Sequence, residues 1–265
     1  MVASVDLARG GRLASLKIHD TEILAPSPSA DNYLHWGCYR ISPWAGRVRS
    51  GAFAFDGRQI QLEVDLPPHA IHGLGYRTPW NAAGSGRLFC DLADRWAFGG
   101  RLDQRLVLTD SSLEMTLSVT ATAGRMPAML GWHPCFRRTL SEDGPEVVLD
   151  FEPGGTWERD VADIPTGRVV DVPDRLWEDC FLGVARAPVL TWPGQLAVRI
   201  ESDAENWVVF DELPGLFCVE PLTDAPDVFN REPRVLELGD VMTLTMRLSW
   251  EQLASARTEQ GQARA

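Results

Sequence analysis

The sequence predicts an all-β protein, organised as one large antiparallel β-sandwich. Apolar and polar residues alternate strictly in several segments, as expected for strands with one buried and one solvated face. The 23 glycines and 18 prolines are spread along the 265 residues, which is frequent enough punctuation for many short strands. We find no long amphipathic helical pattern, internal repeat or low-complexity linker in the sequence.

The clearest predicted strands are those in which four or more apolar residues alternate with polar ones. They cover residues 59–66, 113–122 and 242–250, and shorter segments of the same kind lie at 147–151 and 196–200. Asp56-Gly57 precedes the first of these strands, and this dipeptide predicts a type I′ hairpin turn. A sandwich of this kind has a concave face, where we expect a binding site.

Length and composition favour a single domain over residues 1–250, followed by a tail. All-β sandwiches often reach this length as one unit, and 45% of the residues are apolar, which is enough for a large core. Residues 251–265 are polar and lack large apolar side chains after Leu253. We therefore expect 251–265 to form a frayed polar tail.

The charge balance argues against two classes of partner. The chain has 37 acidic and 25 basic residues, a formal net charge of −12. Such a surface repels the phosphates of nucleic acid and of anionic lipid, so we expect neither nucleic acid nor a membrane as a partner. A neutral small molecule is indifferent to this charge.

The cysteines and the first residues predict a compartment. The chain has five scattered cysteines without a CxxC pair, which argues against a zinc knuckle or redox motif; they are Cys38, Cys90, Cys135, Cys180 and Cys218. The first ten residues lack the continuous apolar run of a signal peptide, and no apolar run approaches the ~20 residues of a membrane helix. We expect a cytoplasmic protein with five free thiols.

Two short segments place an ionisable side chain directly before a proline. His133 precedes Pro134, and Glu220 precedes Pro221. A residue before proline favours extended backbone, and proline cannot donate a hydrogen bond to a sheet. We therefore expect each segment to end a strand, with the histidine and the glutamate at a solvent-facing rim.

Alternation along these two strands adds further expectations. Gly131 shares the face of His133, which predicts space beside the imidazole, and Leu216 and Cys218 share the face of Glu220, which predicts partial desolvation of its carboxylate. Taken singly, His133 is best interpreted as a structural histidine and Glu220 as a surface acid. Because both residues directly precede a proline, an acid–base pair is an equally acceptable interpretation.

A second cluster contains His69 and His72 in HxxH spacing, followed by Trp80. A metal site is a poor interpretation, because residues three apart on a strand face opposite sides and no third ligand lies nearby. The alternative is that His72 donates to a ligand oxygen while Trp80 offers a flat apolar platform. For most tryptophans in the chain, a place in the sandwich core is the simpler interpretation.

A third cluster centres on Arg47, which follows Gly46 between apolar residues. A guanidinium in this setting is normally paired or bound, so a structural ion pair and a ligand contact both explain it. Familiar phosphate and nucleophile motifs are missing: the sequence has no GxxxxGK and no GxSxG, and residues 73–75 lack the third glycine of a dinucleotide site.

Taken in order, these segments resemble the aldose 1-epimerase (galactose mutarotase) family. The most specific is FCVEPLTDAPDVFN, and all of them follow the family's order; they are 43–48, 72–73 with 79–80, 131–136, 178–181 and 217–230. The resemblance implies the large twisted β-sandwich of that family, the galactose mutarotase-like supersandwich. This agrees with the strand pattern.

The resemblance also implies roles for individual residues. Glu220 is similar to the family's general base and His133 to its general acid. His72 is similar to a second donor near the ring oxygen, and Arg47 to a ligand of sugar hydroxyls. The family's asparagine near this arginine is replaced by Ala45-Gly46, which leaves the preferred sugar open.

The family also holds sugar hydroxyls with an aspartate, often three residues before an aromatic residue. That spacing falls on Glu178. We favour the neighbouring Asp179 as the sugar ligand, because Asp-Cys-Phe resembles a family variant.

The implied reaction interconverts the two anomers of a free aldose. Glu220 would take the proton of the anomeric hydroxyl while His133 protonates the ring oxygen; the ring opens, the aldehyde rotates and the ring recloses. Ordinary pKa values of ~4.3 for Glu and ~6.5 for His are close enough for modest burial to tune. We expect no metal and no organic cofactor.

Two alternatives stay open at this point. One is a non-catalytic carbohydrate-binding protein on the same scaffold, since a fold does not determine a function. The other is a mutarotase for sugar phosphates, in which several arginines clamp the phosphate; the candidates are Arg40, Arg47, Arg49 and Arg77. The pattern predicts no oligomeric state.

Overall fold

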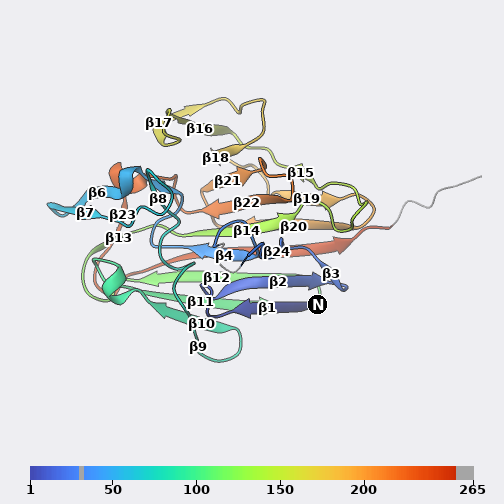
Figure 1. Ribbon diagram of the computed structural model, residues 1–265, viewed down its shortest axis with the longest axis horizontal. Coiled ribbons are helices and arrows are strands. Elements are labelled where there is room, and N and C mark those ends of the chain that lie inside the picture. The colour runs from blue at the N-terminus through green and yellow to red at the C-terminus, as the bar shows by residue number, and fades with distance from the viewer. Residues whose placement is uncertain (30–32, 255–265) are drawn as a thin grey trace, which may run out of the picture.

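The computed structural model describes residues 1–29 and 33–254, which form two large antiparallel sheets (Figure 1). Within those ranges the larger sheet has ten strands and the smaller has eight. In spatial order the larger sheet consists of β1 (Val2–Asp6), β2 (Arg12–Ile18), β4 (Cys38–Ile41), β14 (Gly131–Arg137), β22 (Leu216–Leu222), β21 (Asn206–Phe210), β18 (Glu178–Leu182), β16 (Gly155–Arg159) and β17 (Pro165–Val170), with β3 (Thr21–Glu22) beside β2. The smaller consists of β15 (Val148–Asp150), β19 (Val189–Trp192), β20 (Leu196–Ser202), β24 (Val241–Gln252), β12 (Ser112–Thr120), β11 (Arg101–Leu108), β10 (Arg87–Asp91) and β9 (Asn81–Ala82). The predicted all-β class is confirmed.

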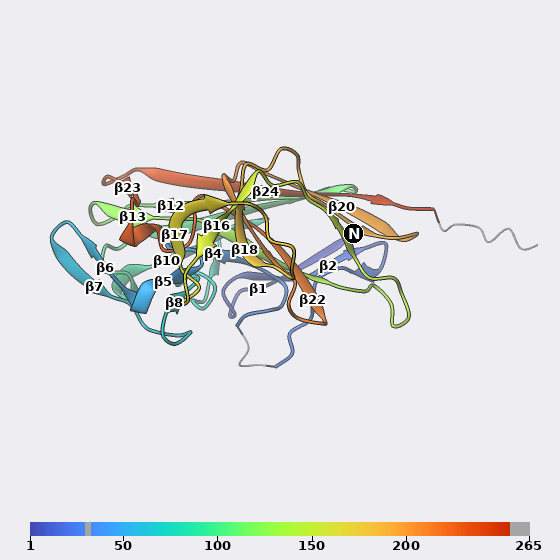
Figure 2. The same ribbon diagram turned by 90° about the horizontal axis from the view of Figure 1, so that it is seen from above.

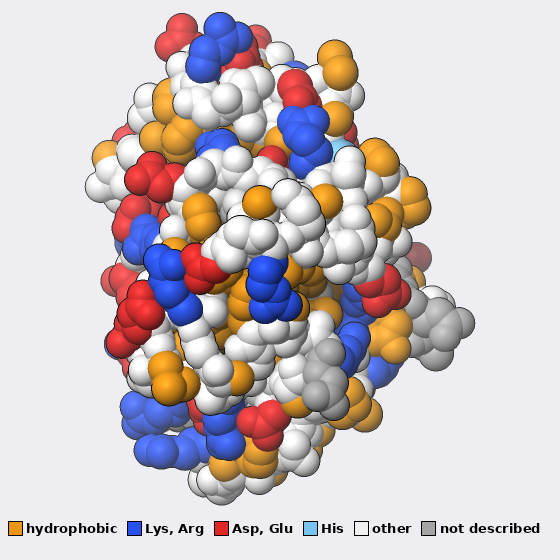
Figure 3. Space-filling view, turned by 90° about the vertical axis from the view of Figure 1, so that its left-hand side faces the viewer, with side chains coloured by type: hydrophobic (Ala, Val, Ile, Leu, Met, Phe, Trp, Pro, Cys, Tyr) orange, Lys and Arg blue, Asp and Glu red, His pale blue; other side chains and the backbone are white. Residues whose placement is uncertain are grey.

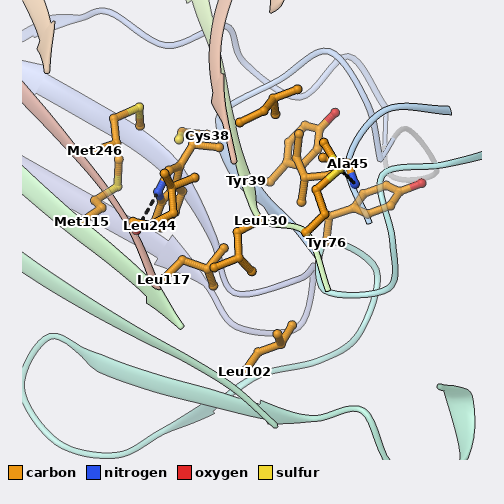
Figure 4. Close-up of a cluster of buried hydrophobic side chains, with 14 of the residues drawn as sticks. Cys38, Tyr39, Ala45, Tyr76, Leu102, Met115, Leu117, Leu130, Leu244 and Met246 are labelled. Atoms are coloured by element: carbon orange, nitrogen blue, oxygen red, sulfur yellow. Dashed lines mark hydrogen bonds between the residues drawn. The ribbon is translucent and has the colours of Figure 1, made fainter. Parts of the chain in front are cut away.

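The main core lies between these two sheets, which appear as stacked layers in Figure 2. Leu117 of β12 and Leu244 of β24 are buried in it, and Figure 4 shows both among the other side chains of this cluster. From the larger sheet Trp132 of β14 enters the same core, fully buried, and its indole Nε1–H donates to the Leu244 carbonyl at 3.4 Å. Burial of one such large side chain stabilises the fold by about 2–3 kcal/mol.

Two of the long alternating segments form strands as predicted. β12 covers most of 113–122, and β24 covers 242–250 and pairs with β12 along its length. β24 continues to Gln252, two residues past the predicted domain boundary, because Glu251 and Gln252 pair with β20. Residues 255–265 of the predicted tail lie outside the described residues.

The predicted strand at 59–66 is shorter than expected. The Asp56-Gly57 hairpin is confirmed: it joins β6 (Ala52–Phe55) to β7 (Arg58–Gln61), with both turn residues at positive φ. β7 ends at Gln61, however. Farther on, the Asp65 carboxylate accepts hydrogen bonds from the Ile71 N–H at 2.8 Å and the Tyr76 hydroxyl at 3.1 Å, contacts that a local alternation does not reveal.

Smaller elements complete the described part of the chain. Two further two-stranded sheets pair β5 (Arg47–Val48) with β8 (Ala70–Ile71) and β13 (Met126–Ala128) with β23 (Arg234–Leu236). The helices among the described residues are short 3₁₀ segments: η1 (Arg49–Gly51), η2 (Ala93–Arg95) and η3 (Val228–Asn230). None of them has the length and apolar character that crossing a membrane requires.

Charged side chains of both signs are mixed on the surface. On the face shown in Figure 3, acidic side chains lie beside basic ones, with small hydrophobic areas between them. Ion pairs such as Arg186 with Asp150 and Glu152, both at 2.7 Å, are examples of this mixing. Exposed pairs of this kind contribute little to stability, about 0–1 kcal/mol each.

Candidate active site

The adjacent central strands β14 and β22 bring His133 and Glu220 together. Gly131 pairs with Leu222 and Cys135 with Cys218, so the antiparallel register places His133 directly opposite Glu220. His133 Nε2 lies 3.2 Å from Glu220 Oε1. The predicted acid and base are therefore within hydrogen-bond distance of each other.

The two prolines lie inside these strands, which continue through them to Arg137 and Leu222. The Cys135 N–H donates to the Gly37 carbonyl at 2.8 Å and the Cys135 carbonyl accepts from the Ala25 N–H at 2.8 Å, so both of its backbone groups point away from β22. Because this direction alternates along a strand, the backbone nitrogens of Pro134 and Pro221 each point toward the other strand, with Pro134 opposite Val219 and Pro221 opposite Trp132. The backbone N–H groups that the two prolines lack are therefore absent only from the pairing between β14 and β22.

The expectation of a solvent-facing rim is therefore wrong. His133 is 5% exposed and Glu220 is 3% exposed, because sheet neighbours lie on both sides of their strands. The predicted desolvation of Glu220 is confirmed. Gly131 does not leave free space, since a Cβ there would lie 2.4 Å from Leu222 Cδ2.

Burial shifts both ionisable groups toward their uncharged forms. Desolvation raises the pKa of Glu220 well above its ordinary value. Desolvation lowers the pKa of His133 well below its ordinary value, and the nearby His72 and His35 act in the same direction. Both directions favour a protonated carboxyl beside a neutral imidazole, a pair with one transferable proton.

His133 and Glu220 line a pocket of about 300 Å³ on the larger sheet. This volume lies at the small end of the range for small-molecule sites, ~300–1,000 Å³. Other lining side chains come from β5, β16, β18 and β21 and from the segment after β8; they include Arg47, Arg159, Glu178, Phe210 and His72. The site thus combines an acid–base pair with donors, acceptors and an aromatic ring.

His72 is held as a neutral hydrogen-bond donor. The backbone N–H of Gly46 donates to the ring nitrogen Nδ1 of His72 at 3.3 Å. In return, the backbone N–H of His72 donates to the Gly46 carbonyl at 3.1 Å. Nδ1 is therefore an acceptor, which leaves the ring proton on Nε2. Desolvation lowers the pKa of His72 to about 3, so the ring stays neutral near pH 7.

Arg47 is anchored by backbone contacts from the 217–230 segment. The Asp227 N–H donates to the Arg47 carbonyl at 2.9 Å, and the Asp227 carboxylate accepts from the Arg49 N–H at 2.8 Å. The Arg47 guanidinium then reaches Glu178, with Nη2 2.6 Å from Oε1. Arg47 therefore has a structural ion pair and also lines the pocket.

Comparison with known proteins identifies the family. A sequence model of the aldose 1-epimerase family matches residues 5–201. The chain belongs to the aldose 1-epimerase family. The matched range includes His133 and ends before Glu220. The place of Glu220 opposite His133 is given by the register of β14 and β22.

Individual relatives agree with this membership. The chain is 25% identical to an uncharacterised Escherichia coli protein, YphB, over 95% of this chain and 93% of that protein. A solved structure of an E. coli K12 protein matches with a TM-score of 0.78 and 24% identity over 95% and 96% of the two chains. A galactose mutarotase-like protein from Clostridium acetobutylicum matches with a TM-score of 0.82 and 16% identity over 95% and 92%. These structures establish the mutarotase-like fold.

Two sequence-predicted ligands do not line the pocket of this aldose 1-epimerase family member. Asp179 is 2% exposed and faces away from it, where its Oδ1 lies 3.2 Å from Arg159 Nε and 2.9 Å from Arg175 Nη2. Trp80 is buried, with its indole N–H donating to the Gly75 carbonyl at 2.8 Å. Glu178 lines the pocket instead of its neighbour.

Among the lining residues that the sequence pattern did not indicate are two aromatic rings and an arginine. Phe210 and His35 stack on each other with ring centroids 5.6 Å apart and an interplanar angle of 11°, and both line the pocket. Arg159 contacts the pocket acid Glu178, with Nη1 3.6 Å from Oε2. The continuous apolar run at 207–210 is typical of a buried strand, but only the register of β21 beside β22 assigns the Phe210 ring to the pocket.

The HxxH pair and the group of four arginines each contribute one side chain to the pocket, His72 and Arg47. His69 Nδ1 accepts from the Ser50 N–H at 3.1 Å, so the HxxH pair serves separate backbone partners. Three of the four arginines considered for a phosphate have other partners: Arg40 donates to the Gly10 and Gly11 carbonyls, Arg49 pairs with Asp160, and Arg77 pairs with Asp65. Only Arg47 of these four lines the pocket.

The His133 ring stacks on a tyrosine of the neighbouring strand. Tyr39 of β4 pairs with His133 in the sheet, and their rings stack with centroids 4.4 Å apart at an angle of 19°. The buried Arg12 guanidinium lies 4.2 Å from the Tyr39 ring centre. Figure 4 shows Tyr39 beside Tyr76 at the edge of the buried cluster.

Proposed function

We propose that this protein interconverts the α and β anomers of a free aldose by acid–base ring opening and reclosure. The single observation that carries the proposal is the 3.2 Å contact between His133 Nε2 and Glu220 Oε1 at a small pocket. Mutarotation requires one group that takes a proton and one that gives a proton, and a pair with one transferable proton supplies both.

In the proposed mechanism Glu220 removes the proton of the anomeric hydroxyl while His133 protonates the ring oxygen. This step uses the ionised form of the pair, with a carboxylate and an imidazolium. That form contains the same number of protons as the uncharged form favoured by burial, so transfer of one proton across 3.2 Å interconverts them. Reclosure on the other face of the aldehyde reverses both transfers, and needs no metal or organic cofactor.

The remaining lining groups bind the sugar. His72 donates from Nε2 to an oxygen near the ring, and Arg47 and Glu178 hold hydroxyls. The stacked Phe210 and His35 offer the apolar surface that the sequence analysis assigned to Trp80. A small neutral aldose fits this set better than a sugar phosphate, because both lining arginines, Arg47 and Arg159, are paired with Glu178. The predicted cytoplasmic location stays part of this proposal.

The test is the rate of anomer exchange with the purified protein. We expect two-dimensional NMR exchange spectroscopy, or polarimetry of freshly dissolved sugar, to give faster mutarotation for at least one aldohexose or aldopentose in buffer containing a chelator. Calorimetry on the same panel measures binding. Sugar binding without faster exchange across the panel would support the carbohydrate-binding alternative and overturn the proposal.

A further inference from the structure

A square of four ionisable side chains lies on one face of β14 and β22. His133 is opposite Glu220, and the next inward pair is Cys135 opposite Cys218. Cys135 and Cys218 are fully buried. The proposed mechanism uses only the first pair and gives the two thiols no role.

One of the thiols is in contact with the ring nitrogen of His133 that faces away from Glu220. Cys135 Sγ lies 3.4 Å from His133 Nδ1. The Cys218 thiol donates to Cys135 Sγ, also at 3.4 Å. A continuous line of contacts therefore runs from Cys218 through Cys135 and His133 to Glu220.

This close contact follows from the strand geometry. The backbone groups of Cys135 bond to Gly37 and Ala25, so Cys135 and Cys218 form a non-hydrogen-bonded pair between β14 and β22. Side chains approach each other most closely at such pairs. His133 and Glu220, two residues along, have the same relation, so the four side chains converge on one face.

We propose that Cys135, supported by Cys218, is a positioning residue that determines which ring nitrogen of His133 exchanges a proton. Cys135 Sγ accepts a hydrogen bond from His133 Nδ1–H, which leaves Nε2 as the nitrogen that faces Glu220 and the sugar. A histidine that exchanges its proton at one nitrogen must keep the other nitrogen protonated and held, and its second partner selects this tautomer. A thiol sulfur is a weak acceptor, and Cys135 Sγ also accepts a hydrogen bond from the Cys218 thiol.

This inference rests on the proposed function, but its test has a readout that does not. Nitrogen-15 NMR of ring-labelled histidine distinguishes a protonated Nδ1 from a protonated Nε2, and the His133 signals are assigned by their loss in His133→Asn. We expect Nδ1 to be protonated in the wild type and a mixture of tautomers in Cys135→Ala. A wild-type ring protonated on Nε2, or an unchanged ring in Cys135→Ala, would overturn the inference even if the protein proves to be no mutarotase.

Kinetics then separates positioning from packing. We expect Cys135→Ala to lower kcat about fivefold to tenfold with little change in KM, the ratio that one ordinary hydrogen bond gives. Cys135→Ser, whose hydroxyl also accepts, should recover most of this loss, and Cys218→Ala should have a smaller effect. Cys90→Ala is the matched control, because Cys90 is another buried thiol whose contact is the Asp91 carbonyl. Equal losses in the alanine and serine variants of Cys135 would indicate packing and contradict the inference.

Discussion

His133 and Glu220 lie directly opposite each other on β14 and β22, with Nε2 and Oε1 3.2 Å apart and a proline following each residue. The prolines remove donors from the strand pairing on either side of this contact. The two side chains consequently form a buried polar pair inside a sheet whose opposite face is core. Their chemistry and their effect on stability can be separated by experiment.

The first prediction concerns catalysis. Glu220→Gln and His133→Asn each remove a proton-transfer partner while nearly preserving shape, so each should lower kcat by about 10²–10⁴-fold. The double variant should lose less than the product of the two, because ring opening needs both transfers together. NMR exchange rates at saturating sugar measure these losses.

A control separates this loss from weaker sugar binding. Arg47→Ala should act mainly on KM, because its guanidinium lines the pocket and lies 2.6 Å from Glu178. If the Glu220 and His133 variants kept turnover within a few-fold of wild type, the proposed acid–base roles would have to be abandoned.

The second prediction concerns stability against pH. Burial raises the folded-state pKa of Glu220 above its ordinary value of 4.5. The stability that this protonated carboxyl contributes is fully present below pH 4.5 and is lost as pH rises through the folded pKa. Glu220→Gln lacks this loss, so its free energy of unfolding should increase relative to wild type as pH rises above 4.5.

His133 should show the opposite direction. Burial lowers its folded-state pKa below the ordinary 6.5, so its contribution is present above pH 6.5 and is lost as pH falls through the folded pKa. His133→Asn should therefore gain stability relative to wild type on acidification. Urea unfolding at a series of pH values measures both differences; a constant offset between variant and wild type in each case would contradict the buried neutral pair.

Much of the fold could be predicted because its signal is local. Alternation within β12 and β24 assigns the side chains that face the core without knowledge of the flanking strands. The Asp56-Gly57 turn likewise requires only that these two residues adopt positive φ. The predicted strand at 59–66 ends early, at Gln61, and beyond it the Asp65 carboxylate bonds Ile71 and Tyr76. Contacts of that kind are made in three dimensions and leave no periodic pattern.

The candidate site was predictable only in part, for a related reason. The proline that follows each of them indicated His133 and Glu220, but their burial depends on which strands flank β14 and β22. The choice between Glu178 and Asp179 depends on which face of β18 meets the pocket, and this is a property of the assembled sheet. The place of Phe210 in the pocket likewise depends on the register of β21 beside β22.

The third prediction separates the two neighbouring acids. Glu178→Gln should raise KM by roughly tenfold, because it weakens a charged hydrogen-bonding group that lines the pocket. Asp179→Asn should leave KM nearly unchanged and lower the free energy of unfolding by about 1–3 kcal/mol, because Asp179 is buried against Arg159 and Arg175. Steady-state kinetics and urea unfolding measure both effects. A raised KM in Asp179→Asn alone would restore Asp179 as the sugar ligand.

The last prediction concerns the glycine that follows His72. Gly73 has φ +75°, and a Cβ there would lie 2.2 Å from the Ser42 carbonyl oxygen, which also accepts from the Leu74 N–H at 2.8 Å. Gly73→Ala therefore combines backbone strain with a clash against backbone, and should cost at least about 3 kcal/mol. Relief of the clash displaces the adjacent His72, so the surviving folded protein should also show a raised KM.

Gly167→Ala is the matched control for this substitution. Gly167 on β17 has φ +91°, but no atom lies within 4 Å of its added Cβ, so only backbone strain of about 1 kcal/mol is expected. Urea unfolding of both variants gives the difference, and sugar kinetics shows whether it reaches the pocket. Equal losses of stability with an unchanged KM would mean that the close approach of Gly73 to Ser42 does not hold His72 in place.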